Sequence, residues 1–208
     1  TVYKPGILTH TDVIGPFPFG YDGSKYTINH VEHASRFAFV STIASKESTE
    51  ALDTYKQAKG RIENILNSRL QTHRSDRGGE YLSHLYKTFL RDHGIKLELT
   101  IRDTPQQNGI AERINRTLEE RTRALLLMSR LPIFLWPELY MTSAYLYNRS
   151  PHAFHGKTPY EAFHGRKPDL SHLRAIGSYA YSHIPKRDRS KLDPTAEKLV
   201  FVGYSPTS

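Results

Sequence analysis

The sequence predicts an α/β fold in which a mixed sheet is flanked by helices. Three short apolar segments come first, and their spacing is typical of an antiparallel meander: 7–14, 26–31 and 37–43. Helical spacing of apolar residues follows over 47–69 and leads directly into a further strand over 70–76. Because a strand that is reached through a helix can lie parallel to an earlier one, the expected sheet is mixed.

The same alternation of helix and strand continues through the middle of the chain. A short helix is expected over 83–93, stopped by Gly94, and a strand is expected over 95–101. The segment 104–131 opens with Pro105 and an Asn-Gly pair, which predict a turn-prone loop. The rest of that segment has the periodicity of a long helix.

This long helix has two different faces at about 100° per residue. Apolar Ile114, Leu118 and Leu125 fall on one side and are expected to face a core. Charged side chains share the other side: Glu112, Arg116, Glu119 and Arg123. One interpretation is a solvated face, on which each glutamate pairs with the arginine four residues later. The other is that Glu112, next to the loop, has a chemical role.

Beyond residue 132 the sequence predicts additional helices and a small β appendage. A helix over 137–149 opens at Trp136-Pro137, and a shorter one runs from Pro159 to Phe163. Two short strands within 177–204 flank a basic loop. Two domains are therefore expected: a core over 1–150 and a C-terminal extension over 151–208.

Composition narrows the possible partners of the chain. Its 208 residues are 38% hydrophobic and 24% charged, which is typical of a globular protein. It has no cysteine, which excludes disulfides and thiolate ligands, and no apolar run of about 18 residues, so no membrane partner is expected. The net charge is +8, with the basic excess in 59–131 and 149–208. This charge favours a polyanionic partner, most simply nucleic acid.

Three acidic residues stand at positions where chemistry is often found. Asp12 lies inside the first strand, Asp76 at the end of the fourth, and Glu112 at the start of the long helix, with thirty-five residues between Asp76 and Glu112. Carboxylate oxygens suit Mg²⁺ or Mn²⁺, and two such ions can hold the attacking and leaving oxygens of a phosphoryl displacement. For Asp12 the alternative is an edge-strand aspartate that faces water.

Seven motifs in order along the chain carry a resemblance to a known family. They are HTDVIGP (10–16), HRSDRGGEY (73–81), TPQQNGIAERINRTL (104–118), LWPE (135–138), YLYNRSP (145–151), TPYEAF (158–163) and SKLDPTAEKLVFVGY (190–204). With these motifs the chain resembles the integrases of copia-type long-terminal-repeat retrotransposons, over nearly its full length. The resemblance implies a catalytic core over 1–150 with a ribonuclease-H-like fold.

The resemblance also implies an activity and its residues. Asp12, Asp76 and Glu112 match the family's acidic triad and would be both catalytic residues and ligands of two Mg²⁺ or Mn²⁺ ions. The implied enzyme is a DNA integrase, a polynucleotidyl transferase with endonuclease activity. In the implied reaction, water activated by the metal ions would first cut near the 3′ end of element DNA, and the freed 3′-OH would then attack target DNA. Asp12 and Asp76 would bind a metal jointly, and Glu112 would hold the second.

The implied partners are element-end DNA, target DNA and further copies of the chain. The TPQQNG segment would be a mobile loop that contacts DNA ends. Polar and basic residues there and on the following helix are expected to bind DNA: Gln106, Gln107, Asn108, Arg113, Asn115, Arg116 and Arg123. Nucleus and cytoplasm are the expected locations, in a virus-like particle or preintegration complex.

Two other functions stay open. The stretch 32–36 reads Glu-His-Ala-Ser-Arg where the family usually has two acidic residues and Tyr-Ser-Arg, and 102–103 is Arg-Asp where the family has Pro-Tyr. These departures allow an inactive nucleic-acid-binding domain derived from an integrase. A ribonuclease-H-type nuclease would share the fold and the metals. Closely spaced histidine pairs have no cysteine partner, so an intrinsic zinc site is not expected.

Overall fold

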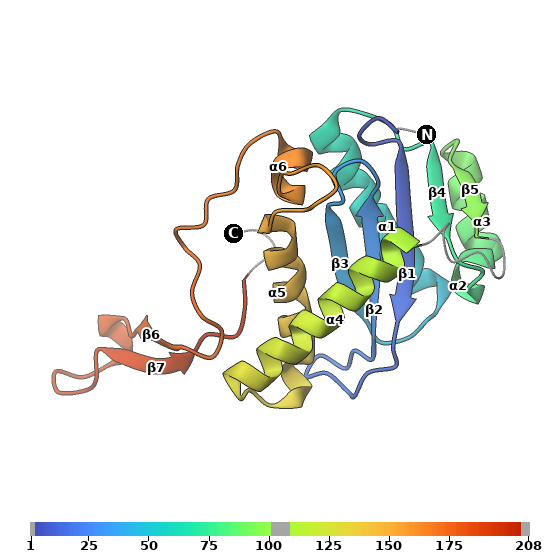
Figure 1. Ribbon diagram of the computed structural model, residues 1–208. Helices are drawn as coiled ribbons and strands as arrows, with labels where there is room; N and C mark the ends of the chain where they lie inside the picture. Colours follow the sequence, from blue (N-terminus) through green and yellow to red (C-terminus); the bar gives the residue numbers. More distant parts are fainter. Residues whose placement is uncertain (1–2, 101–108, 205–208) are drawn as a thin grey trace.

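The structure, a computed structural model, describes residues 3–100 and 109–204 and contains the expected mixed sheet (Figure 1). Its strands are β1 (Leu8–Ile14), β2 (Tyr26–Glu32), β3 (Ala38–Ile43), β4 (Thr72–Ser75) and β5 (Lys96–Leu99). The spatial order is β3-β2-β1-β4-β5, in which β1, β2 and β3 are antiparallel neighbours and β4 and β5 run parallel to β1. The interpretation of Asp12 as an edge-strand residue is therefore wrong, because β1 is the central strand.

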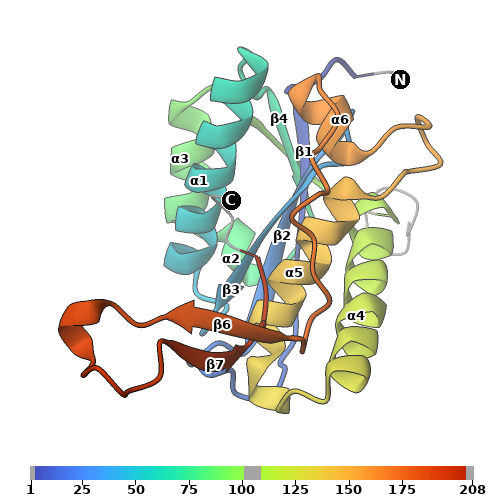
Figure 2. The same ribbon diagram turned by 90° about the vertical axis from the view of Figure 1, so that its left-hand side faces the viewer.

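Helices cover both faces of this sheet (Figure 2). One face carries α1 (Ser48–Leu66), the single turn α2 (Gly79–Leu82) and α3 (His84–Asp92). The other face carries α4 (Gly109–Ser129) and α5 (Trp136–Arg149), with a 3-10 turn at Ile133–Leu135 between them. The helix α1 ends earlier than the sequence predicts, because Asn67 takes the left-handed conformation (φ 45°) that often closes a helix.

Two apolar cores result, one on each face of the sheet. The core under α1 and α3 is rich in aromatic rings, and Tyr55, Tyr81 and Tyr86 are fully buried in it. The core under α4 and α5 is built around Leu118 and Trp136. Removal of this apolar surface from water, at about 25 cal/mol per Å², is the main force that holds the layers together. Ile114 and Leu118 of the predicted apolar stripe thus face the core under α4 and α5, whereas Leu126 packs against it in place of the expected Leu125.

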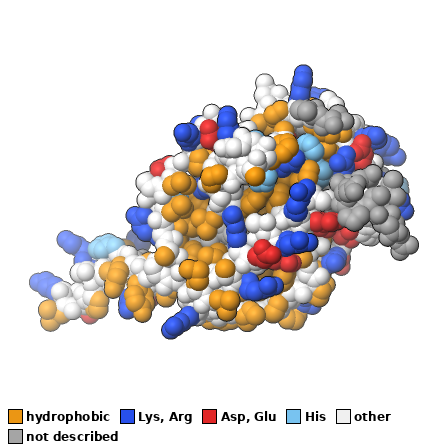
Figure 3. Space-filling view, in the orientation of Figure 1, with side chains coloured by type: hydrophobic (Ala, Val, Ile, Leu, Met, Phe, Trp, Pro, Cys, Tyr) orange, Lys and Arg blue, Asp and Glu red, His pale blue; other side chains and the backbone are white. Residues whose placement is uncertain are grey.

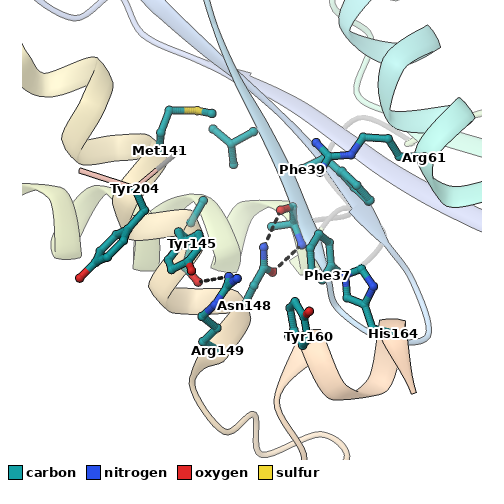
Figure 4. Close-up of a pocket in the computed structure, with 13 residues that line it drawn as sticks. Phe37, Phe39, Arg61, Met141, Tyr145, Asn148, Arg149, Tyr160, His164 and Tyr204 are labelled. Carbon is teal, nitrogen blue, oxygen red and sulfur yellow. Dashed lines mark hydrogen bonds between the residues drawn. The ribbon is translucent and has the colours of Figure 1, made fainter. Parts of the chain in front are cut away.

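At the first residue of the edge strand β3, a side chain bonds the outward-facing backbone groups. Asn148 of α5 accepts a hydrogen bond from the Ala38 amide and donates one to the Ala38 carbonyl oxygen, each at 2.9 Å (Figure 4). An exposed strand edge would otherwise offer these two groups to another chain. The helix α6 (Pro159–His164) packs nearby, with the Phe163 ring stacked on Phe37 at 4.6 Å.

The last part of the chain forms the expected small β unit. Antiparallel β6 (Tyr179–His183) and β7 (Ala196–Val200) make a separate two-stranded sheet, which projects away from the main body in Figure 1. The basic loop between them contains a short 3-10 turn, Lys186–Asp188. None of the helices in the described ranges is both long and apolar enough to cross a membrane. The domain boundary at residue 150 stays a prediction.

Candidate active site

Asp12 and Asp76 lie at the same edge of two neighbouring strands. The parallel register pairs Leu8 with Thr72 and His10 with Arg74. Continued two residues beyond its last pair, past the end of β4, this register would bring Asp12 level with Asp76, and the charge of Asp76 does act on Asp12. The helix α4 packs across β1 at this point (Figure 1), and the side-chain amide of Asn115 donates a 2.7 Å hydrogen bond to Oδ2 of Asp12.

The electrostatics of Asp12 link it to both other acidic residues. Burial, together with the negative charges on Asp76 and Glu112, raises the pKa of Asp12 to about 7, although hydrogen bonds from the Val13 amide and Asn115 act in the opposite direction. Glu112 and Asp76 are therefore within electrostatic range of Asp12. A carboxyl group in this position is half protonated near neutral pH unless a cation offsets the repulsion.

The three carboxyl groups differ in how firmly they are held. Asp76 follows β4 directly, and its Oδ1 accepts a 2.9 Å hydrogen bond from the Gly78 amide. Glu112 is exposed on the first turn of α4. Within 3–100 and 109–204, no three His, Asp or Glu side chains are already gathered closely enough to hold a metal ion. The acidic residues therefore share one region without forming a finished coordination shell.

Asn115, which is expected from the sequence to bind DNA, is buried in the structure. This residue is only 6% exposed, and its Oδ1 accepts a 2.6 Å hydrogen bond from Asn29 while its amide donates to Asp12. Asn29 in turn donates to the Tyr140 hydroxyl at 3.0 Å. Both ends of the Asn115 amide are thus occupied inside the protein, so it positions Asp12. Neither Asn29 nor Tyr140 is expected from the sequence, because Asn29 lies in a strand that has other polar residues, Thr27 and His30, and does not stand out there.

Of the other residues expected to bind DNA, the three arginines lie within the described residues and the three polar residues do not. Arg113, Arg116 and Arg123 are exposed on α4. Gln106, Gln107 and Asn108 lie outside the described residues. The two ion pairs of the solvated-face interpretation, Glu112 with Arg116 and Glu119 with Arg123, do not form among the described side chains. Basic and acidic side chains lie close to one another where α4 crosses this face (Figure 3).

A cavity of about 230 Å³ lies away from the acidic residues, beside β3 (Figure 4). Aromatic rings and cationic groups line it, and the Arg149 guanidinium packs 3.3 Å from the Tyr145 ring centre and 4.9 Å from that of Tyr160. The described residues that line it include no carboxylate. This cavity is therefore separate from the site around Asp12.

The fold is similar to that of the catalytic cores of retroviral integrases. The core domain of the bovine immunodeficiency virus integrase superposes with a TM-score of 0.57 at 19% identity, covering 76% of this chain and 93% of that one. The magnesium complex of the HTLV-2 integrase core, in a trimeric form, gives 0.58 at 21% identity, covering 77% and 97%. These likenesses confirm the predicted ribonuclease-H-like fold.

Sequence comparison shows the family itself. The model of the integrase core domain matches residues 2–105, and that of the retroviral polymerase SH3-like domain matches residues 178–208, which include β6 and β7. The Pol polyprotein of the tobacco (Nicotiana tabacum) transposon TNT 1-94 is 36% identical over 201 residues, or 95% of this chain. That of transposon RE2 from Arabidopsis thaliana is 28% identical over the whole chain. The chain therefore belongs to the integrase core family, as its motifs predicted.

The chain spans only a small part of these relatives. It covers 15% of the tobacco polyprotein and 14% of the Arabidopsis one. Both relatives are retrovirus-related polyproteins of transposons, which confirms the resemblance to copia-type elements found in the motifs. Most of each polyprotein therefore lies outside the region that this chain matches.

Proposed function

We propose that this chain is the catalytic core of a retroelement integrase, which processes the 3′ ends of element DNA and joins them to target DNA. The observation that carries the proposal is the coupling of Asp12 to two further acidic residues on an integrase fold. Burial and the charges of Asp76 and Glu112 hold the pKa of Asp12 at about 7. Such clustering of like charge is costly for a structural site and typical of a functional one.

The donor set fits a hard divalent cation. All three groups offer only carboxylate oxygens, which Mg²⁺ and Mn²⁺ prefer, and a cation would relieve the repulsion that raises the pKa of Asp12. Asp12 and Asp76 would hold one ion jointly, and Glu112 would help to hold a second. Bound there, the ions would stabilise the charge that develops on the attacking and leaving oxygens of a phosphodiester.

The chain's own residues position the reactants. Asn115 fixes the orientation of Asp12, and the Gly78 amide fixes that of Asp76. The nucleophile is first water, which hydrolyses a phosphodiester near the 3′ end. It is then the freed 3′-OH, which forms a new ester with target DNA while the target's own 3′ oxygen leaves. No side chain forms a covalent intermediate.

Binding of the DNA is assigned to polar and basic groups beside this site. Arg113, Arg116 and Arg123 would contact phosphates, and Gln106, Gln107 and Asn108 would contact DNA ends. Assembly of several copies on DNA is supported by two structural neighbours, an HTLV-2 core in a trimeric form and a simian T-cell lymphotropic virus intasome. The simian assembly superposes with a TM-score of 0.65 at 15% identity. Nucleus and cytoplasm are the proposed locations.

A nicking and strand-transfer assay tests the proposal. The chain is incubated with Mn²⁺ and labelled duplexes that carry the ends of its own element. Shortened 3′ ends and longer joined products are expected. Asp76→Asn should abolish both products, whereas Asp92→Asn, an equal change at an exposed position on α3, should leave them unchanged. Equal product from Asp76→Asn and the unchanged chain would exclude the mechanism.

An inactive DNA-binding domain is the alternative, favoured by the lack of a finished metal shell among the described residues. It predicts salt-dependent DNA binding with no stabilisation by Mg²⁺ or Mn²⁺. A rise in melting temperature with either ion would count against it. Cleavage of RNA/DNA hybrids without strand transfer would instead favour a nuclease of the ribonuclease H type.

A further inference from the structure

A second cavity, of about 140 Å³, lies beside the first turns of α4. Its walls come from three separate parts of the chain: Arg36 after β2, Ile110, Arg113 and Ile114 of α4, and His152 and Phe154 after α5. Its volume is well above the ~30 Å³ that one water molecule takes in the liquid, so it has room for a small ion. The polar groups that line it in the described part of the chain are all basic.

Arg36 is the most unusual of these groups. It is 8% exposed, and its Nη1 is buried with no hydrogen-bond partner among the described residues. The acidic residue closest in sequence, Glu32, does not offer a free oxygen, because its carboxylate accepts from the Gly6, Ala34 and Ser35 amides and from the Ser35 hydroxyl. A buried guanidinium group with an unpartnered donor is costly unless a ligand completes its bonding.

The position of Arg36 is fixed by its surroundings. Its φ of 61° and the 3.0 Å bond from its amide to the Glu32 carbonyl oxygen define the tight turn between β2 and β3. Its guanidinium packs over the Phe154 ring, 4.2 Å from the ring centre. The turn is tied to the loop of Phe154 by a 2.9 Å bond from His155 Nε2 to the Ser35 carbonyl oxygen. The Arg36 guanidinium group is thus held in place at the cavity before a ligand binds.

His152 and Arg113 complete the set of donors. His152 Nδ1 accepts a 3.1 Å hydrogen bond from the Phe154 amide, which in a neutral ring leaves the proton on Nε2 as a donor. Arg113 donates from Nε to the Gly109 carbonyl oxygen at 2.8 Å, and its terminal nitrogens remain as further donors. Neither arginine forms an ion pair with a described carboxylate.

Positive charge on any one of these groups disfavours positive charge on the others. Burial lowers the pKa of Arg36, and the charge of Arg113 lowers it further, against opposing effects of Tyr147 and Glu32. Burial, the neighbouring His155 and both arginines lower the pKa of His152. An anion in the cavity would attract all of these groups and so offset the repulsion between them.

We propose that this cavity is a binding site for one phosphate group of a nucleic-acid strand. Two guanidinium forks and an imidazole N–H approach from three elements, an arrangement that suits the several acceptor oxygens of a tetrahedral phosphate. The net charge of +8 gives the chain affinity for such a strand. Arg113 follows Glu112 directly on α4, so a strand at the acidic site passes close to the cavity. The choice of nucleic acid as the source rests on the proposed function.

The first test measures DNA binding in EDTA, where no strand cutting is expected. Affinity for a labelled duplex is followed by fluorescence anisotropy from 0.05 to about 0.5 M salt. One phosphate contact contributes about 0.9 to the slope of log K against log salt, or about eightfold in affinity per decade of salt. Arg113→Gln, at an exposed helix position, and Arg36→Gln should each reduce the slope by about 0.9.

Lys87→Gln is the matched control, because it removes one exposed charge from α3 on the opposite face of the sheet. It should leave the slope unchanged. An unchanged slope in Arg113→Gln would overturn the proposal even if Arg36→Gln fails to fold. Asp76→Asn should keep the full slope, so failure of this site and failure of the proposed catalysis are distinguishable.

The second test uses inorganic phosphate alone. The ring-proton NMR signals of His152 are followed as phosphate replaces chloride at constant ionic strength. A shift that saturates, and that Arg113→Gln abolishes, is expected. A phosphate response with no effect of Arg113→Gln on the DNA slope would overturn the nucleic-acid assignment in favour of a free phosphate ligand. No response in either test would overturn the site itself.

Discussion

The side-chain amide of Asn115 donates a 2.7 Å hydrogen bond to Oδ2 of Asp12, across 103 residues of sequence. Because Asn115 Oδ1 also accepts from Asn29, and Asn29 donates to Tyr140, α4, β2 and α5 all contribute to the orientation of one carboxyl group. The hydrogen bond from Asn115 favours the charged form of Asp12. Asn115 is therefore a positioning residue that also tunes the acidity of Asp12.

Asn115→Ala should raise the pKa of Asp12 above its present value of about 7, because the bond that favours the carboxylate is lost. It should also reduce the free energy of unfolding by about 1 to 3 kcal/mol, since the Asn29 amide loses a buried partner. Carboxyl ¹³C NMR titration and urea denaturation measure the two effects. Met128→Ala, at an exposed position near the end of α4, is the control. A stability loss with no change in the titration would contradict the tuning role.

Much of the fold could be predicted from local patterns, but the roles of particular residues could not. Helical and strand periodicities are properties of short segments, so β1 and α4 lie near their expected positions. Strand order is not local, and the sequence therefore left open whether Asp12 was central or at an edge. The buried role of Asn115 depends on Asn29, 86 residues away, which no periodicity reports.

The cavity around Arg36 illustrates the same limit. Its walls meet only after the turn at β3, the first turns of α4 and the loop after α5 have packed together. Local sequence shows three separate basic residues, each of which is typical of a solvated surface. Only the folded structure shows that Arg36 is buried and that the Glu32 carboxylate already accepts hydrogen bonds from other groups.

Asn148→Ala should destabilise the protein and expose the edge of the sheet. The variant leaves both the amide and the carbonyl group of Ala38 without their partner, at a cost of about 2 to 4 kcal/mol in the free energy of unfolding. The free edge of β3 should also increase self-association. Urea denaturation and light scattering measure these effects. Ser150→Ala, which removes a bond only to the Leu146 carbonyl of the same helix, should cost much less. Equal costs would exclude the edge-closing role.

Stability should fall as the pH drops from about 6.5, in part because His30 is buried in its neutral form. Burial lowers the pKa of His30 to about 3, so between its unfolded pKa of about 6.5 and pH 3 the unfolded chain binds a proton that the folded chain does not. The free energy of unfolding should therefore fall by up to about 1.4 kcal/mol per pH unit for this residue alone. His10 and His33, with pKa values lowered by burial to about 3 and about 4, act in the same direction.

His30→Gln should lower the number of protons taken up on unfolding by about one and so flatten the dependence of the free energy of unfolding on pH. Urea denaturation at several pH values between about 7.5 and 4.5 measures this slope. The imidazole contacts Thr54 Oγ1 at 3.1 Å, so some stability is lost at every pH, and the slope rather than the absolute value is the informative quantity. His84→Gln, at an exposed position on α3, should keep the full slope. An identical slope in His30→Gln and the unchanged chain would show that His30 does not titrate as its burial requires.

Addition of Mn²⁺ should stabilise the folded chain, and more strongly at pH 8 than at pH 6. At ten times the dissociation constant, a ligand of the folded state adds about 1.4 kcal/mol, which corresponds to about 3 to 6 °C in melting temperature for a chain of this size. Burial and the charge of Asp76 hold the pKa of Asp12 at about 7, so at pH 6 protons compete with the metal for this carboxylate and the shift should be smaller. Differential scanning fluorimetry with and without EDTA measures it. Asp12→Asn should lose the shift and Asp92→Asn should keep it; a shift of the same size in Asp12→Asn would mean that Mn²⁺ binds elsewhere.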